Sequence, residues 1–177
     1  MIVEDIATQL SLAQAFGFVS FVLGLSTFYQ KDDRRLKIVM LILNLNHLIH
    51  YLLMGSIVSA LSAVLSALRT ATAIYISSAW VAAVFIVVSV SFGVALADSV
   101  WQLWPILGTV IGTYSVFMLK GIAMRLAFLA GATCWLINNI LIGSIGGTLL
   151  ELSVITINIV TIMRLVRDQK QSLAISK

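Results

Sequence analysis

Charged residues, cysteine and proline are all scarce in this sequence. Only 10% of its 177 residues are Asp, Glu, Lys or Arg, while 60% are hydrophobic; a typical soluble domain is about 25% charged. A soluble core of this size could not hide so much apolar surface, so part of that surface must face lipid. The single cysteine, Cys134, excludes an internal disulfide and leaves the redox compartment open.

Several function classes have no motif here. No basic run is interleaved with aromatic residues on a polar face, so we expect no nucleic-acid partner. No acid–base pair, nucleophile–base pair, ATP-binding motif or cofactor motif occurs, which predicts that the protein is not an enzyme and uses no cofactor. His47 and His50 are three residues apart but lack further ligands, so we predict no metal site.

What the sequence does contain is a series of apolar runs separated by short charged or glycine-rich breaks. Each run approaches the roughly 20 residues that a helix needs to cross a membrane. The N-terminus reads MIVEDIATQ, acidic where a signal peptide carries Lys or Arg, so we expect the first run to remain as a membrane helix. The chain is predicted to be a single, all-α membrane domain over 1–177, with seven transmembrane helices at roughly 9–29, 37–54, 57–76, 79–97, 102–119, 124–142 and 147–166.

The charges indicate how these helices are oriented. If the loop QKDDRRLK is placed on the cytoplasmic side and the helices alternate, all eleven Lys and Arg residues fall on that side. The opposite side then holds Glu4, Asp5 and Asp98, with Glu151 near it. The pattern predicts an external N-terminus and a cytoplasmic C-terminal tail, residues 167–177.

Two stretches of the chain are related at a spacing of 88 residues. Gly55-Ser56-Ile57 recurs as Gly143-Ser144-Ile145, and several polar or small residues recur at the same spacing. We therefore predict two three-helix units, 9–76 and 102–166, joined by a linker helix at 79–97. The number of spans from the start of one copy to the start of the next is even, so both copies have the same orientation and form a parallel repeat. The further pairs are Gln14 with Gln102, Gly24 with Gly112, Lys37 with Arg125, and Thr70 with Asn158.

The stretch from Trp104 to Arg164 carries a family resemblance, most specifically in Gly143-Ser144-Ile145-Gly146-Gly147-Thr148 and Glu151. Ala67-Leu68-Arg69-Thr70 extends it into the first half. In these residues the chain resembles the bacterial inner-membrane YgjV-like family, which implies a location in the bacterial inner membrane. The architecture is similar to that of SWEET, PQ-loop and PnuC-type proteins, which implies small-solute transport by analogy. The Pro-Gln pair that names the PQ-loop proteins is absent.

Polar residues inside the predicted spans are the candidate substrate-binding residues, because they are costly in lipid. Arg69 continues a stripe of serines; it either extends to the cytoplasmic interface or faces a wet cavity where it binds an anion or a carboxylate. Trp135 and Asn139 are four residues apart and share a face that suits a ring-shaped or sugar-like solute, unless they serve helix packing. The full set is Arg69, Trp135, Asn139, His47, His50, Glu151 and Asn158.

The remaining members of that set have similar alternatives. His47 and His50 can have a hydrogen-bonding or proton-linked role, or can bond neighbouring helices. Glu151 lies near the outer end of its helix and can be interfacial. Asn158 lies near the middle of the membrane, where it cannot reach the surface, so it is the strongest single pore-facing candidate.

The functional hypothesis is movement of a small polar solute through a cavity between the two three-helix units, with the lipid bilayer as the other partner. The alternative is a receptor or an accessory or assembly protein that transports nothing. A membrane-embedded enzyme is the least favoured, for want of catalytic residues. Because both units are in one chain, a monomer suffices, and a homo-oligomer is also compatible.

The predicted topology can be tested with a tag on the C-terminus. A membrane-impermeant label added to intact cells should leave this tag unmodified and should modify it once the inner membrane is permeabilised. Labelling of the tag in intact cells would contradict a periplasmic N-terminus and a cytoplasmic C-terminus.

Overall fold

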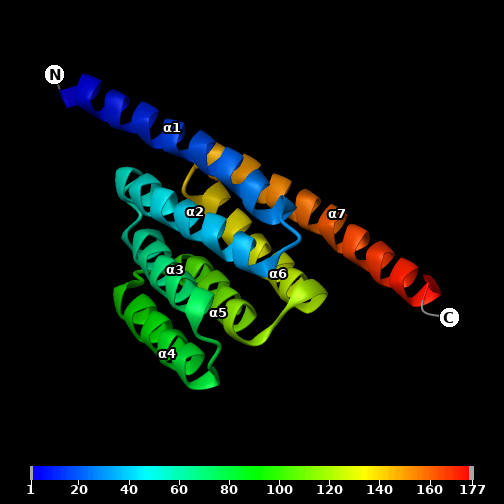
Figure 1. Ribbon diagram of the computed structural model, residues 1–177. Helices are drawn as coiled ribbons and strands as arrows, with labels where there is room; N and C mark the ends of the chain where they lie inside the picture. Colours follow the sequence, from blue (N-terminus) through cyan, green and yellow to red (C-terminus); the bar gives the residue numbers. More distant parts are fainter. Residues whose placement is uncertain (1, 176–177) are drawn as a thin grey trace.

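The computed structural model describes residues 2–175, and the side chains of residues 12–171 within them. Regular structure in that range is entirely helical, with seven α-helices and one short 3-10 helix, η1 (Figure 1). The bounds are α1 (Ile2–Tyr29), α2 (Asp33–Leu53), α3 (Ile57–Tyr75), α4 (Ala79–Leu96), η1 (Val100–Leu103), α5 (Trp104–Met118), α6 (Gly121–Leu141) and α7 (Ile145–Ile175).

The prediction of an all-α membrane protein is confirmed. Among the described residues, six helices (α1 to α4, α6 and α7) are long and apolar enough to cross a membrane. α5 has 15 residues, because the residues before it form η1 and Pro105 occupies its first turn, where the missing N–H is tolerated. A seventh span over 102–119 therefore stays a prediction.

The helix ends differ from the predicted spans mainly at charged residues. α2 begins at Asp33 because Asp32 caps it, with its Oδ1 accepting a hydrogen bond from the Arg35 N–H at 2.7 Å. α7 continues to Ile175, through most of the stretch predicted as a tail. Hydropathy identifies the apolar part of a helix that can lie in lipid. It does not show where the polar ends of the same helix begin or end.

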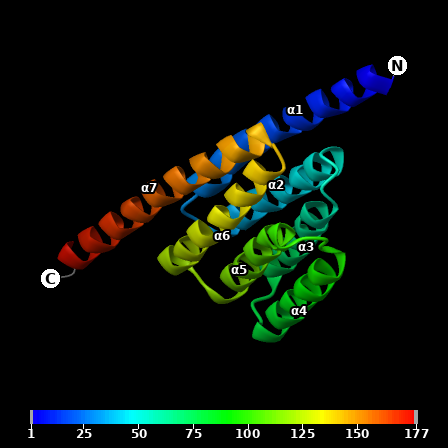
Figure 2. The same cartoon turned by 180° about the vertical axis from the view of Figure 1, so that it is seen from behind.

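Six of the helices form a closed circuit. α1 packs on α2, α2 on α3, α3 on α5, α5 on α6, α6 on α7, and α7 returns to α1. α4 stays outside this circuit, against α3 and α5. Figures 1 and 2 show α1 and α7 along one side of the bundle, α4 on the opposite side, and the two termini extending from opposite ends.

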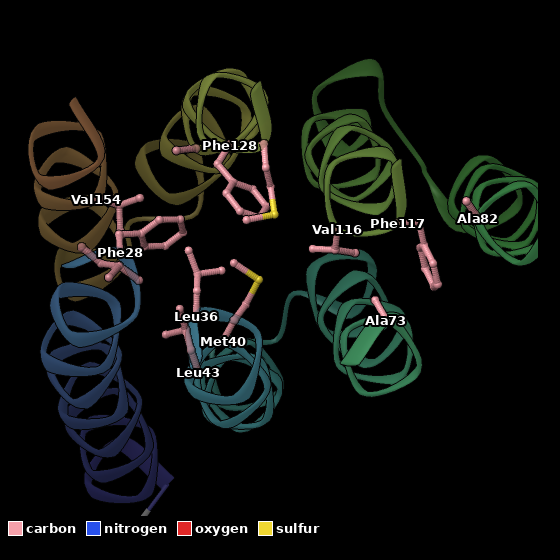
Figure 3. Packing of buried hydrophobic residues seen from close by; sticks show 13 residues of the cluster. Phe28, Leu36, Met40, Leu43, Ala73, Ala82, Val116, Phe117, Phe128 and Val154 are labelled. Carbon is pink, nitrogen blue, oxygen red and sulfur yellow. The ribbon is translucent and has the colours of Figure 1, made fainter. Parts of the chain in front are cut away.

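Apolar side chains from these helices pack together inside the circuit. Figure 3 shows Phe28 of α1 and Phe128 of α6 together, beside Met40 and Leu43 of α2 and Val154 of α7. The two phenylalanine rings meet edge to face, with 5.6 Å between their centroids. Many large apolar side chains point outward instead, and Trp80 is 85% exposed, as expected of a surface that lipid covers.

The turns after α2 and α6 are built alike, 88 residues apart. Gly55 and Gly143 each adopt a φ of +70°, which a residue with a side chain rarely adopts. In the first turn Met54, Gly55 and Ser56 donate backbone hydrogen bonds to His50, Leu52 and Tyr51. In the second, the residues 88 positions later repeat all three bonds. These bonds satisfy carbonyls at the helix ends, which lipid and headgroups would otherwise leave unpaired.

α1 and α7 approach each other closely at Gly17 and Gly146. A Cβ added at Gly146 would lie 2.5 Å from the Gly17 carbonyl carbon and 2.9 Å from the Phe18 nitrogen. Because these neighbours are backbone atoms, they cannot move aside as a flexible side chain could. Small residues therefore let the first and last helices of the chain pack backbone to backbone.

Substitution of Gly146 tests this contact. Gly146→Ala should destabilise the folded protein by about 2 kcal/mol, because α7 must move away from α1. The measurement is unfolding of the detergent-purified protein by titration with a denaturing detergent. The matched control is Gly131→Ala on α6, whose added Cβ would meet its nearest atom at 3.6 Å, an ordinary contact. Equal stability of the two variants would contradict the close approach.

Candidate functional site

A cavity of about 70 Å³ lies at the centre of the circuit, and every helix except α4 and η1 contributes to its lining. Its apolar walls include the side chains that Figure 3 labels as Phe28, Met40, Leu43, Phe128 and Val154. Its polar walls are fewer, and they come from α2, α3, α6 and α7. They are Asn44, His47, Ser66, Arg69, Trp135 and Glu151.

Arg69 faces this cavity and does not extend to the membrane surface, since its side chain is only 5% exposed. Its Nη2 donates one long hydrogen bond, 3.3 Å, to the Ser66 Oγ. Its Nε and Nη1 have no partner among the described residues. Gly112 of α5 makes room for the guanidinium, because a Cβ there would lie 2.6 Å from Nη2. The site thus holds a cation whose hydrogen-bonding capacity is largely unused.

Glu151 of α7 is the acidic residue of the cavity. Glu151 is also only 5% exposed and lines the cavity. It therefore does not lie at an exposed interface, which was one alternative of the prediction. The ion pairs found among the described side chains are Lys31 with Asp168 and Arg125 with Asp33, so Glu151 pairs neither with Arg69 nor with any other cation there. A basic and an acidic side chain therefore face one small cavity without pairing with each other.

Aromatic rings form the wall between α2 and α6. Trp135 stacks on Tyr51 with 5.5 Å between ring centroids and an interplanar angle of 15°. His47 lies 6.4 Å from the same Trp135 ring, and its Nε2 has no partner among the described residues. Asn44, His47 and Tyr51 share one face of α2, which their spacing of three and four residues already indicated.

Of the seven predicted site residues, the structure brings four to the cavity: Arg69, His47, Trp135 and Glu151. The other three hold helices together. Asn139 accepts a hydrogen bond from the Tyr51 hydroxyl at 3.0 Å, and Asn158 donates one to the Arg125 carbonyl at 2.7 Å. His50 bonds the Ala13 carbonyl at 2.7 Å and the Ser144 Oγ at 2.8 Å.

Two lining residues, Asn44 and Ser66, were absent from the predicted set. The Asn44 Nδ2 donates to the Ser66 carbonyl and to the Thr70 Oγ1, each at 3.2 Å. The signals for them were present in the sequence, since Ser66 belongs to the serine stripe that leads to Arg69. That stripe equally suits helix packing, which is why Ser66 was not singled out.

A buried arginine outside the cavity lining, Arg125, joins three segments of the chain. Arg125 is fully buried, and its Nη1 donates to Asp33 Oδ1 and to the Gly121 carbonyl, each at 2.9 Å. Its Nη2 donates to the carbonyls of Gln30 and Lys31, each at 3.0 Å. This fork fastens the turn between α1 and α2 to the start of α6. Lys31 extends the connection to α7 through its 2.6 Å ion pair with Asp168.

The helices, their apolar exterior and the charged cavity define an α-helical, multi-pass integral membrane protein. The chain matches the model of the Imp-YgjV family, described as bacterial inner membrane protein, over residues 11–169. It is 36% identical over 162 residues to the inner membrane protein YgjV of Escherichia coli (strain K12), covering 92% of this chain and 88% of that protein. The chain therefore belongs to the Imp-YgjV family of bacterial inner membrane proteins. No solved structure matches it.

Family membership confirms the resemblance seen in the sequence and the location in the bacterial inner membrane. The wider likeness to SWEET, PQ-loop and PnuC-type proteins stays a prediction.

The Arg125 fork can be tested by removing it. Arg125→Met should destabilise the protein by about 3 kcal/mol, because it leaves Asp33 and three carbonyls without their donor. Arg125→Lys should recover part of this loss only, since an ammonium has three donors whereas Arg125 bonds four acceptors. Unfolding in detergent measures both effects, with the exposed Arg35→Gln as the control. Stability of Arg125→Met equal to the control would contradict the fastening role.

Proposed function

We propose that this protein is a seven-span transporter or facilitator that passes a small polar solute through the central cavity. The observation that carries the proposal is the unpaired state of Arg69 and Glu151, both buried against the same cavity. Charged groups within a membrane are expensive and mark solute or ion pathways when they face a cavity. A purely structural pair would be expected to bond directly, as Arg125 and Asp33 do.

The contacts of the helices support the predicted parallel repeat. With α1, α2 and α3 as one unit and α5, α6 and α7 as the other, each contact in the circuit has a counterpart at the equivalent position. Tyr51 and Asn139 are 88 residues apart and bond each other; His47 and Trp135 have the same spacing, and their rings are neighbours. Contacts between equivalent residues are expected where a pseudo-two-fold axis passes.

The length of α5 together with η1 supports the seventh span. With about 2.0 Å of rise per 3-10 residue and 1.5 Å per α-helical residue, residues 100–118 extend over about 30 Å. That length matches the hydrocarbon layer. The linker helix α4 would then cross between the two units, outside the circuit.

The distribution of charge supports the proposed orientation. The bonds between Arg125, Asp33, Lys31 and Asp168 place the turn after α1, the start of α6 and the late part of α7 at one end of the bundle. The basic residues of those segments therefore gather at one end, which is the cytoplasmic one under the positive-inside tendency. Asp98 lies in the turn after α4, at the other end.

Contacts at the two ends of the helix bundle are candidates for alternating gates. The fork of Arg125 joins the two units at the basic end. At the other end, His50 to Ser144 and Tyr51 to Asn139 join them again. Alternating access requires one set of contacts to open while the other holds. The glycine contacts between α1 and α7, and between Arg69 and Gly112, lie at the two seams where the units would move.

Transport can be tested in proteoliposomes by stopped-flow light scattering after an osmotic step. The panel should contain small neutral, anionic, cationic and zwitterionic solutes, and at least one should enter faster than into protein-free liposomes. Ala132→Leu, which fills the cavity from α6, should reduce that rate at least tenfold, because the solute then lacks space.

Ala130→Leu is the matched control, because Ala130 is exposed on the outer face of the same helix while Ala132 lines the cavity. The control should retain the full rate. Permeability equal to that of empty liposomes for every solute class, with folded protein, would contradict the proposal.

A further inference from the structure

The two unpaired charges of the cavity have different chemical requirements. Arg69 presents a planar guanidinium with two N–H-bearing atoms, Nε and Nη1, that have no partner in the described part of the chain. Each of these atoms forms a two-donor edge together with Nη2, which makes only one long bond to Ser66, so such an edge suits a carboxylate or another planar oxyanion. Glu151 presents a carboxylate with no cation beside it, so it suits a group with positive charge and N–H donors. The cavity thus offers one recognition group of each sign.

Charge balance decides between classes of solute. An anion would satisfy Arg69 but would be repelled by Glu151 in a region of low dielectric, and a cation would meet the opposite problem. A neutral solute would leave the Arg69 cation uncompensated and would require Glu151 to take up a proton. A solute that carries one charge of each sign satisfies both groups and adds no net charge to the interior.

The walls restrict the size of such a solute. The cavity volume is about 70 Å³, and roughly 10–15 Å³ is enough to hold one water molecule, so there is room for a few water-sized groups. One face of Trp135 is stacked on Tyr51, and Asn139, which accepts a bond from the Tyr51 hydroxyl, does not line the cavity. The ring-shaped solute suggested by the spacing of Trp135 and Asn139 is therefore disfavoured.

We propose that the cavity binds a small zwitterion, with its carboxylate on Arg69 and its ammonium group on Glu151. This inference rests on the proposed function and specifies the solute class of the same site. Arg69 comes from α3 and Glu151 from α7, which belong to different three-helix units. The bound solute would therefore bridge the two units and would favour the state in which both charges face the cavity.

The first test uses the full-length, detergent-purified protein and three small probes at pH 7. Glycine carries both charges, acetate only the carboxylate, and methylammonium only the cation. Binding is measured by the rise in melting temperature and by calorimetric titration. Glycine should raise the melting temperature, with an affinity at least tenfold higher than that of either single-charge probe. Equal or tighter binding of acetate or methylammonium, or no effect of glycine at millimolar concentration, would overturn the inference.

The second test changes one charge at a time with side chains of similar shape. Glu151→Gln should weaken glycine binding at least tenfold and strengthen acetate binding, because the repulsion from the carboxylate is removed. Arg69→Gln should weaken glycine binding and strengthen methylammonium binding for the converse reason. If Arg69 and Glu151 had only a structural role, their substitution would not weaken the binding of one probe and strengthen that of another. The exposed substitutions Asp98→Asn and Arg34→Gln serve as controls and should change no affinity.

The outcomes separate this inference from the proposed function. If a solute of another class enters proteoliposomes while glycine does not bind, the inference of a zwitterion site is wrong and the proposed transport function is supported. Glycine binding with the predicted exchange of preference, but without flux of any solute, would support the site and contradict transport. If a substitution prevents folding, the comparison of the three probes on the unaltered protein still shows whether the site prefers a zwitterion.

Discussion

A lipid environment supplies no hydrogen-bond partners, and this constraint shapes nearly every feature of the molecule. Backbone groups are satisfied within helices and in the two similar turns at Gly55 and Gly143. Buried polar side chains mostly bond to neighbouring helices, and the fork of Arg125 is the strongest case. Arg69 has two unused donors and faces the cavity, and Glu151 faces the same cavity with no cation beside it, which is why the proposed function is built on them.

The six helices of the circuit surround one cavity. The two proposed three-helix units meet along two seams of this circuit. One seam joins the first and last helices, where Gly17 and Gly146 permit backbone contact. The other joins α3 to α5, where Gly112 leaves space for Arg69. Small residues thus serve different purposes at the two seams: close packing at one, and room for a buried cation at the other. α4 packs outside the circuit against α3 and α5, and therefore lies over the second seam.

Much of the fold could be predicted because membrane helices are long apolar runs with recognisable breaks. The charged turn before α2 and the glycine turns were located well, whereas helix ends were not, because polar residues can continue a helix beyond the lipid, as Arg167 and Asp168 do in α7. The candidate site could be predicted only in part. Spacing identifies the residues that share a helical face but not what that face contacts, so Asn158 was favoured for the pore although it binds the Arg125 carbonyl.

The sequence by itself determined the class of the protein, its helices, the asymmetry of its charges and its family, because each depends on composition or on local order along the chain. Only the tertiary structure decided that Arg69 and Glu151 face one cavity while Asn139 and His50 fasten helices. The physical reason is distance along the chain. These contacts join residues far apart in sequence, and their partners are set by the order in which six helices close into a circuit, which no local pattern encodes.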